Sequence, residues 1–244
     1  MAHCVGCGAQ NRIANKGAAS RLSAASAIGL LGGTFDPIHF AHLRLAEEVA
    51  ETFDLQQVRL IPACVPPHRG QPQASPAHRL AMTRLAITGN PRLSVDAREL
   101  DRSGASYTVD TLAEIRAELG QRPLCLLMGA DAFVLLTTWH RWSELFDLAH
   151  IIVARRPGFP LEQLASSLPR QLHTQYNERL EHEHAAVTSA PAGKVFTHEL
   201  TALDVSATAL RNLIHRNASL RYLLPDSVIA YIQKHHLYRE SDAG

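Results

Sequence analysis

The sequence has little that would indicate a membrane protein, a secreted protein or a polyanion-binding protein. No stretch reaches the roughly 18 uninterrupted apolar residues that a membrane-spanning helix needs. Residues 24–31 form only a short apolar run that leads into a glycine turn, so we expect no signal peptide and a cytoplasmic location. The net charge is +1 over 244 residues, which gives no general reason to expect nucleic acid as a partner. Any anion site must therefore be local.

Cysteine is also scarce, with four residues in the chain. Cys4 and Cys7 form one Cys-x-x-Cys pair, and a structural zinc there is the less favoured alternative, because zinc needs four ligands and only His3 could add a third. Cys125 lies inside the apolar run 124–128 and is expected to be buried. Hydrophobic residues make up 46% of the chain, so a core can form without disulfides or metals.

The order of apolar runs predicts the fold class. Residues 1–26 hold too little apolar material to repay the entropy of ordering them, so we expect a disordered extension before a single domain over 27–244. Short apolar runs predict strands, and apolar positions at helical spacing or Ser, Thr, Asp and Pro start signals predict helices. The strands are expected over 28–31, 58–61, 93–97, 124–128, 150–154 and 194–200, and the helices over 45–53 and from 76, 108, 206 and 226. This alternation predicts an α/β fold with a doubly wound parallel sheet, Rossmann-like in type.

Two later segments are expected to differ from the regular part. Residues 159–192 are polar and punctuated by proline, so they predict a variable segment of helices and loops. Within it, the Glu-His-Glu-His stretch 181–184 could bind a metal, but a solvent-exposed face is the favoured interpretation. Residues 204–244 predict a small C-terminal helical subdomain.

The most distinctive stretch follows the first expected strand and reads Gly-Gly-Thr-Phe-Asp-Pro-Ile-His-Phe-Ala-His over residues 32–42. Glycine after a strand lets the backbone turn tightly and approach a ligand. His39 and His42 are three residues apart at the start of a helix, so they share a face beside free amide groups and the positive end of the helix dipole. The stretch is neither a dinucleotide fingerprint nor a Walker A loop. It predicts a compact anion site, whereas either histidine taken alone would more often be incidental.

This stretch resembles the signature of the HxGH nucleotidyltransferases, relatives of the class I aminoacyl-tRNA synthetases. The chain is most similar to the bacterial nicotinate-mononucleotide adenylyltransferase family, over about residues 28–238 and through several separate motifs. The resemblance implies that His39 contacts the triphosphate and the reacting phosphate and that His42 assists. Ala41 stands where the family usually has glycine, and its methyl group is expected to crowd the adenine or ribose and so to affect ATP affinity.

The resemblance also implies the rest of the ATP site. In Pro-Pro-His-Arg, Arg69 is expected to reach phosphate with its planar fork of donors. Gly129 would allow a close approach of the ligand, and Asp131 would accept hydrogen bonds from the ribose or else cap a helix. The Ser-x-Thr-x-x-Arg motif places two hydroxyls near free helix amides and an arginine one turn later, a geometry expected to hold the β- and γ-phosphates. The full set of expected ATP ligands is Gly32, Gly33, Thr34, Phe35, Arg69, Gly129, Asp131, Ser206, Thr208 and Arg211, with His39, His42 and Arg211 as the catalytic residues.

The pyridine side is assigned in the same way. Trp139 is expected to stack on the nicotinate ring, since an aromatic plane suits that ring. By resemblance, Thr108 lies near the ring carboxylate and Arg155 faces the mononucleotide. Trp142 is expected to pack in the core instead.

The implied reaction is the transfer of the adenylyl group of ATP to nicotinate mononucleotide, which gives the deamido dinucleotide and pyrophosphate. The attacking phosphate is ionised at neutral pH, so no general base is needed, and catalysis rests on alignment and charge neutralisation. His39, His42, Arg69 and Arg211 are expected to supply positive charge, with Mg²⁺ arriving on the triphosphate. The alternatives are an adenylyltransferase or cytidylyltransferase that acts on nicotinamide mononucleotide or phosphopantetheine, or a nucleotide-binding sensor without catalysis. A homodimer is a further open expectation.

Overall fold

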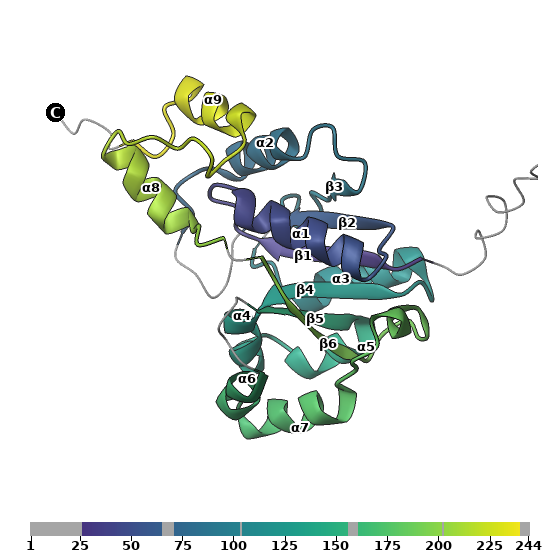
Figure 1. Ribbon diagram of the computed structural model, residues 1–244. Helices are drawn as coiled ribbons and strands as arrows, with labels where there is room; N and C mark the ends of the chain where they lie inside the picture. Colours follow the sequence, from purple (N-terminus) through teal and green to yellow (C-terminus); the bar gives the residue numbers. More distant parts are fainter. Residues whose placement is uncertain (1–25, 65–70, 103, 156–160, 202, 240–244) are drawn as a thin grey trace, which may run out of the picture.

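The computed structural model describes residues 26–64, 71–102, 104–155, 161–201 and 203–239. They form an α/β structure around one sheet of six parallel strands in the order β3-β2-β1-β4-β5-β6 (Figure 1). The strands are β1 (Ile28–Gly33), β2 (Gln57–Pro62), β3 (Leu93–Val95), β4 (Leu124–Gly129), β5 (His150–Arg155) and β6 (Val195–Glu199). The predicted fold class and the six expected strands are confirmed.

The sheet is covered on both faces, as its apolar strands require. Successive side chains point to opposite faces, so Leu31 and Cys125 join one hydrophobic cluster whereas Leu30 and Leu126 join the other. The first cluster is covered by α1 (Phe40–Thr52), α2 (Pro76–Ala86), α8 (Ala207–His215) and α9 (Asp226–Lys234). The second is covered by α3 (Thr108–Leu119), α4 (Ala130–Val134), α5 (Leu145–Leu148), α6 (Leu161–Ser167) and α7 (Arg170–Arg179). In Figure 1, α2, α8 and α9 gather at one end of the molecule and α6 and α7 at the other.

Several helices begin where the sequence predicted. The hydroxyl of Ser75 accepts a hydrogen bond from the amide of His78 at 3.3 Å, directly before Pro76 at the first helical position. The hydroxyl of Ser206 accepts from the amide of Ala209 at 3.2 Å and caps α8 in the same way. Because each of these caps satisfies an otherwise free amide, each fixes the start of its helix.

Two expected strands are shorter than predicted: the strand expected over 194–200 lacks one residue at each end, and the strand expected over 93–97 lacks its last two. The strand expected over 93–97 ends at Val95, because the carboxylate of Asp96 turns the chain. This carboxylate accepts a hydrogen bond from the amide of Arg98 at 3.1 Å, and from the Arg98 guanidinium at 2.7 Å. An Asx turn of this kind offers the backbone an alternative to strand pairing.

The segment expected over 159–192 does contain helical pieces in its described part, namely α6, α7 and a 3₁₀ turn at His184–Thr188. His182 and Glu183 are exposed, as a solvated face requires. His184 differs, because its ring packs on Phe53 with 4.4 Å between centroids. Within the described ranges, no three His, Cys, Asp or Glu residues lie close enough together to hold a metal ion.

The described residues include one of the two cysteine sites considered in the sequence, and all the helices that could be tested for a membrane span. Cys125 is buried, as predicted, and this burial raises the pKa of its thiol. Cys4 and Cys7 lie outside the described residues, as does the extension expected over 1–26 apart from Ser26. Among the described helices, none has both the length and the apolar character needed to cross a bilayer.

Candidate active site

The chain changes direction across the sheet between β1 and β4. From β1 it runs outward to β2 and β3, and then returns to build β4, β5 and β6 on the other side. In open parallel sheets, ligands bind outside the carboxyl ends of the strands at such a switch point. The sequence motifs after β1 and β4 therefore meet at the expected edge of the sheet.

Gly32 and Gly129 differ in whether the surrounding protein leaves room for a side chain. A Cβ atom added at Gly32 would meet no described atom within 4 Å, so packing of the described protein does not demand glycine there. A Cβ atom added at Gly129 would collide with the carboxylate of Asp131. Gly129 is also the N-cap of α4, so the alternative that Asp131 itself caps this helix is wrong. The exposed Asp131 carboxylate instead folds back over the end of β4.

His39 and His42 form one unit at the start of α1. Their rings stack with 3.8 Å between centroids and 27° between planes. The main-chain amide of His39 donates to Nδ1 of His42 at 3.3 Å. Because Nδ1 accepts, the proton of the neutral His42 ring lies on Nε2, which makes Nε2 a hydrogen-bond donor.

Arg211 comes from the other end of the chain and reaches the segment of residues 34–42 that carries His39 and His42, here called the histidine loop. It lies on α8, and its Nη1 donates to the main-chain oxygen of Asp36 at 2.7 Å. Its Nη2 donates to the hydroxyl of Thr208 at 3.3 Å. Asp36 stands three residues before His39, so the two motifs that the sequence places far apart lie side by side. The Ser-x-Thr-x-x-Arg motif and the histidine loop therefore share one site.

Asp36 is a buried hub that the sequence analysis did not identify. Its side chain is only 6% exposed, and its carboxylate accepts hydrogen bonds from the amides of Gln73 and Ala74 at 2.8 and 3.1 Å. The hydroxyl of Tyr238 donates to the same carboxylate at 2.8 Å. Burial, together with the negative charge of Asp36, raises the pKa of Tyr238. The carboxylate thus ties the loop after β1 to α2 and to the C-terminal end of the described chain.

Arg79 is a second buried residue that the sequence analysis missed. It is fully buried on α2 and donates to the main-chain oxygens of Thr34 and Ala63, both at 2.7 Å, and of Cys64 at 3.0 Å. These bonds fix the loops after β1 and β2 against each other. A charged residue beside Met82 and Thr83 on the inner face of a helix was the available signal.

Arg69 lies outside the described residues, so its expected contact with phosphate stays a prediction. Cys64 and Gln73, on either side of that segment, are held by Arg79 and Asp36 respectively. Both anchors belong to the histidine-loop side of the sheet edge.

The two pyridine-side motifs are also brought together. Tyr107, which precedes α3, packs its ring on His140 with 4.4 Å between centroids. The carboxylate of Asp110 lies 3.3 Å from Nη1 of Arg141. These contacts place the start of α3, with Thr108, against the segment that holds Trp139. Trp139 is half-buried against the second hydrophobic cluster.

Two other expected residues have clear surroundings. Arg155 ends β5, and its Nη2 lies 3.4 Å from a carboxylate oxygen of Glu199 at the end of β6. Trp142 packs edge-to-face on Phe146 with 6.2 Å between centroids, as core packing predicts.

Two hollows among the described residues lie elsewhere. A hollow of about 380 Å³ lies over α1 and α2, and one of about 600 Å³ lies between α8 and α9. Neither is lined by a predicted site residue. We assign the site by chemistry instead, because phosphate binding needs convergent donors, and Arg211 lies beside the loop that carries His39 and His42 at the switch point.

Comparison with known proteins agrees with this geometry. Residues 30–213 match the model of a family described as cytidylyltransferase-like. The chain is 51% identical to a probable nicotinate-nucleotide adenylyltransferase of Dechloromonas aromatica (strain RCB), over 88% of this chain and 98% of that protein. It is 50% identical to the protein of the same name from Halorhodospira halophila (strain DSM 244 / SL1), over 82% and 90% of the two chains.

Solved structures agree at the level of the fold. Nicotinic acid mononucleotide adenylyltransferase of Plasmodium falciparum, complexed with NaAD, superposes with a TM-score of 0.65 at 16% identity, over 87% of this chain and 97% of that one. The same enzyme complexed with APC gives a TM-score of 0.64. With the relatives above, these matches lead to one conclusion: the chain belongs to the nicotinate-nucleotide adenylyltransferase family.

Proposed function

We propose that this protein transfers the adenylyl group of ATP to nicotinate mononucleotide, giving nicotinate adenine dinucleotide and pyrophosphate in NAD biosynthesis. The observation that carries the proposal is the 2.7 Å hydrogen bond from Arg211 to the main-chain oxygen of Asp36. It supports a single phosphate site built from both ends of the chain. The names of relatives that are about half identical over most of the chain support the choice of substrate.

The chemistry asks little of the protein beyond placement and charge. A phosphate oxygen of the mononucleotide attacks the α-phosphorus of ATP, a new P–O bond forms, and the bond to the β-phosphate oxygen breaks. The attacking oxygen is already ionised, and the electron pair of the broken bond leaves on pyrophosphate. The protein therefore has to align two anions and stabilise the negative charge that develops on the leaving group.

The catalytic roles follow from the donors at the switch point. His39 contacts the reacting phosphate, and His42 donates from Nε2 to the triphosphate. Arg211 holds the β- and γ-phosphates, and the hydroxyl of Thr208 orients its guanidinium. The amide groups at the starts of α1 and α8 add partial positive charge where the phosphates lie.

The remaining proposed contacts fall around these donors. On the ATP side, Gly32 and Gly33 let the nucleotide approach the end of β1, Asp131 binds the ribose, and Arg69 reaches phosphate. Thr34, Phe35, Gly129 and Ser206 complete this side. On the pyridine side, Trp139 stacks on the ring, Thr108 lies near its carboxylate, and Arg155 faces the mononucleotide.

Mg²⁺ is proposed to enter with ATP, held by the triphosphate oxygens. Asp36, the buried acid of the loop after β1, is poorly suited to bind it, because its carboxylate already accepts hydrogen bonds from two amides and the Tyr238 hydroxyl. When bound, the ion would supply charge neutralisation on the triphosphate. The side chains of His42 and Arg211 stabilise the phosphates directly.

The proposed partners are small molecules, ATP and nicotinate mononucleotide, without nucleic acid. A homodimer and a cytoplasmic location stay predictions. Sedimentation of the purified protein would decide the first, and fractionation of cells the second.

The function is tested by pyrophosphate release from purified protein given ATP with each acceptor in turn. Nicotinate mononucleotide, nicotinamide mononucleotide and phosphopantetheine are compared, with CTP replacing ATP as a further arm. We expect turnover to be fastest with ATP and nicotinate mononucleotide. Faster turnover with phosphopantetheine or with CTP would overturn the assignment, and no release with any acceptor would favour a nucleotide sensor.

A further inference from the structure

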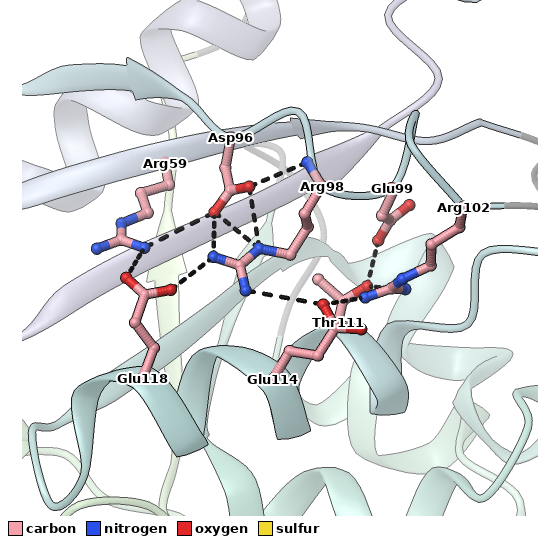
Figure 2. A network of polar contacts seen from close by, with 8 residues as sticks. All are labelled: Arg59, Asp96, Arg98, Glu99, Arg102, Thr111, Glu114 and Glu118. Atoms are coloured by element: carbon pink, nitrogen blue, oxygen red, sulfur yellow. Dashed lines mark hydrogen bonds and ion pairs between the residues drawn. The ribbon is translucent and has the colours of Figure 1, made fainter.

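The connection from β3 to α3 carries a polar network that the proposed reaction does not use (Figure 2). One half lies beside the sheet, where Arg98 bonds the carboxylates of Asp96 and Glu118 at 2.7 and 2.8 Å and Arg59 pairs with Glu118 at 3.2 Å. Glu118 is nearly half exposed, so these pairs contribute little stability individually. The other half lies at the start of α3 and is more deeply buried.

Glu99 is the unusual member of that buried half. It is 7% exposed, and its desolvation raises the pKa of the carboxyl. The hydroxyl of Thr111 donates to it at 2.7 Å. The same hydroxyl accepts from Nη1 of Arg102 at 2.8 Å, and Nη2 of Arg102 lies 2.6 Å from Glu114. Thr111 therefore joins the carboxyl group of Glu99 to the guanidinium of Arg102 through a single oxygen.

The buried hydroxyl of Ser106 adjoins the same group. It lies near enough to lower the pKa of Glu99, although no bond of standard geometry joins Ser106 to a described residue. Ser106 stands two residues before Thr108, the residue proposed to lie near the pyridine carboxylate. The buried half of the network thus surrounds the residues that enter α3.

These bonds are connected to the pyridine side through one turn of helix. Thr111 lies three residues after Thr108, and its amide donates to the main-chain oxygen of Tyr107 at 3.2 Å. Tyr107 packs on His140, next to Trp139. A shift of the first turn of α3 would move both proposed contacts with the pyridine ring, because the helix and the tryptophan segment are held together.

We propose that Glu99, Thr111 and Arg102 are positioning residues that set the affinity for the pyridine mononucleotide by holding the first turn of α3. This inference rests on the proposed function for the identity of the ligand. It assigns a role to residues that touch neither substrate. If the network served only for stability, its disruption would lower the melting temperature but would not change KM for one substrate more than KM for the other.

The test compares Thr111→Val, which removes the hydroxyl at nearly constant shape, with Thr111→Ser, which keeps it. Glu118→Gln is the matched control, because it alters the exposed half of the same network. KM for nicotinate mononucleotide, KM for ATP and kcat are measured well below the melting temperature of each variant. Amide hydrogen exchange of residues 104–112 is measured on the same proteins without substrate.

We expect Thr111→Val to raise KM for the mononucleotide by about tenfold, because small misplacements of binding groups are costly, while KM for ATP stays within about twofold. Its exchange over 104–112 should be faster than in the wild type. Thr111→Ser and Glu118→Gln should behave as the wild type in both measurements. Glu99→Gln, which keeps an oxygen for the Thr111 hydroxyl, should be milder than Glu99→Ala.

Unchanged exchange over 104–112 in folded Thr111→Val would overturn the inference, as would equal increases in both KM values. If the wild type does not turn over nicotinate mononucleotide at all, the proposed function fails instead. In that case the comparison of exchange between Thr111→Val and Thr111→Ser still decides whether the network holds the start of α3.

Discussion

Arg211 donates a hydrogen bond from Nη1 to the main-chain oxygen of Asp36 at 2.7 Å, across 175 residues of sequence. The bond places the guanidinium of α8 beside the start of α1, where His39 and His42 stack. A guanidinium held by a carbonyl keeps its charge and its remaining donors. The arrangement is therefore preorganised for a polyanion, which is what charge stabilisation in a transition state requires.

Replacing Arg211 by alanine should reduce kcat by on the order of 10²-fold, the usual effect of losing one preorganised donor. Steady-state rates of dinucleotide formation would measure this. Arg216→Ala is the matched control, because Arg216 is exposed near the end of the same helix and bonds only the main-chain oxygen of Asn212 among its described contacts. Near-normal turnover in Arg211→Ala would show that Arg211 has no role in catalysis.

The histidine pair predicts different outcomes for fold and for rate. His42→Asn should keep an acceptor for the amide of His39 but lose the donor at Nε2. We expect its melting temperature to stay close to that of the wild type, while kcat falls by on the order of 10²-fold. His39→Ala should lose turnover to a similar extent. A His42→Asn enzyme with wild-type kcat would show that Nε2 does not act on the phosphates.

Tyr238→Phe should weaken both stability and turnover, because the buried carboxylate of Asp36 loses a donor. An unsatisfied buried group costs about 1–3 kcal/mol, to be read from urea unfolding. Turnover should fall as well, since Asp36 also holds Arg211. Tyr222→Phe is the control, because Tyr222 is 88% exposed. Equal stability of Tyr238→Phe and the wild type would argue against a stabilising bond between Tyr238 and Asp36.

Acid should destabilise the fold partly through His150, whose pKa is lowered by burial in β5. Its ring lies 2.8 Å from the main-chain oxygen of Ala190 and accepts the amide of Lys194 at 3.1 Å. Because the unfolded chain binds the proton more tightly, this stability is present above the ordinary histidine pKa of 6.5 and declines as the pH falls below it.

The measurement is the free energy of unfolding between about pH 7.5 and pH 5 for the wild type and His150→Asn. The variant should lose less stability over this range. His198, whose pKa is also lowered by burial, is present in both proteins, so the difference isolates His150. Parallel curves would show that His150 does not titrate in this window.

Ala41 offers a gain-of-affinity test. It is half-buried at the second position of α1, beside His42. Ala41→Gly should lower KM for ATP by a few-fold and leave KM for the mononucleotide unchanged. Glycine costs about 1 kcal/mol within a helix, so a small drop in melting temperature should accompany the change. An unaltered KM for ATP would show that the methyl group does not crowd the nucleotide.

The parts of the fold that could be predicted are those set by local pattern. The apolar run before Gly32 and the Ser75-Pro76 start signal each determine their own element. The proximity of Asp36 and Arg211 could be expected only from the resemblance, because no local pattern predicts a contact between residues that lie 175 positions apart.

Asp36, Arg79 and Glu99 escaped the sequence analysis for a common reason. Each is a charged residue that is buried only because partners from distant segments satisfy it. Arg79 is satisfied by main-chain oxygens, and Glu99 by the hydroxyl of Thr111. Main-chain donors and acceptors carry no residue signature, so their convergence is visible only in three dimensions.

The central claim is that the histidine loop and Arg211 act on one triphosphate, and a double-mutant cycle tests it most directly. The kcat for dinucleotide formation is measured for the wild type, His39→Ala, Arg211→Ala and the double variant. Residues that act as a unit are strongly non-additive, so we predict a loss in the double variant well below the product of the two single losses. A loss equal to that product would mean that the two ends of the chain act independently, and it would contradict the account.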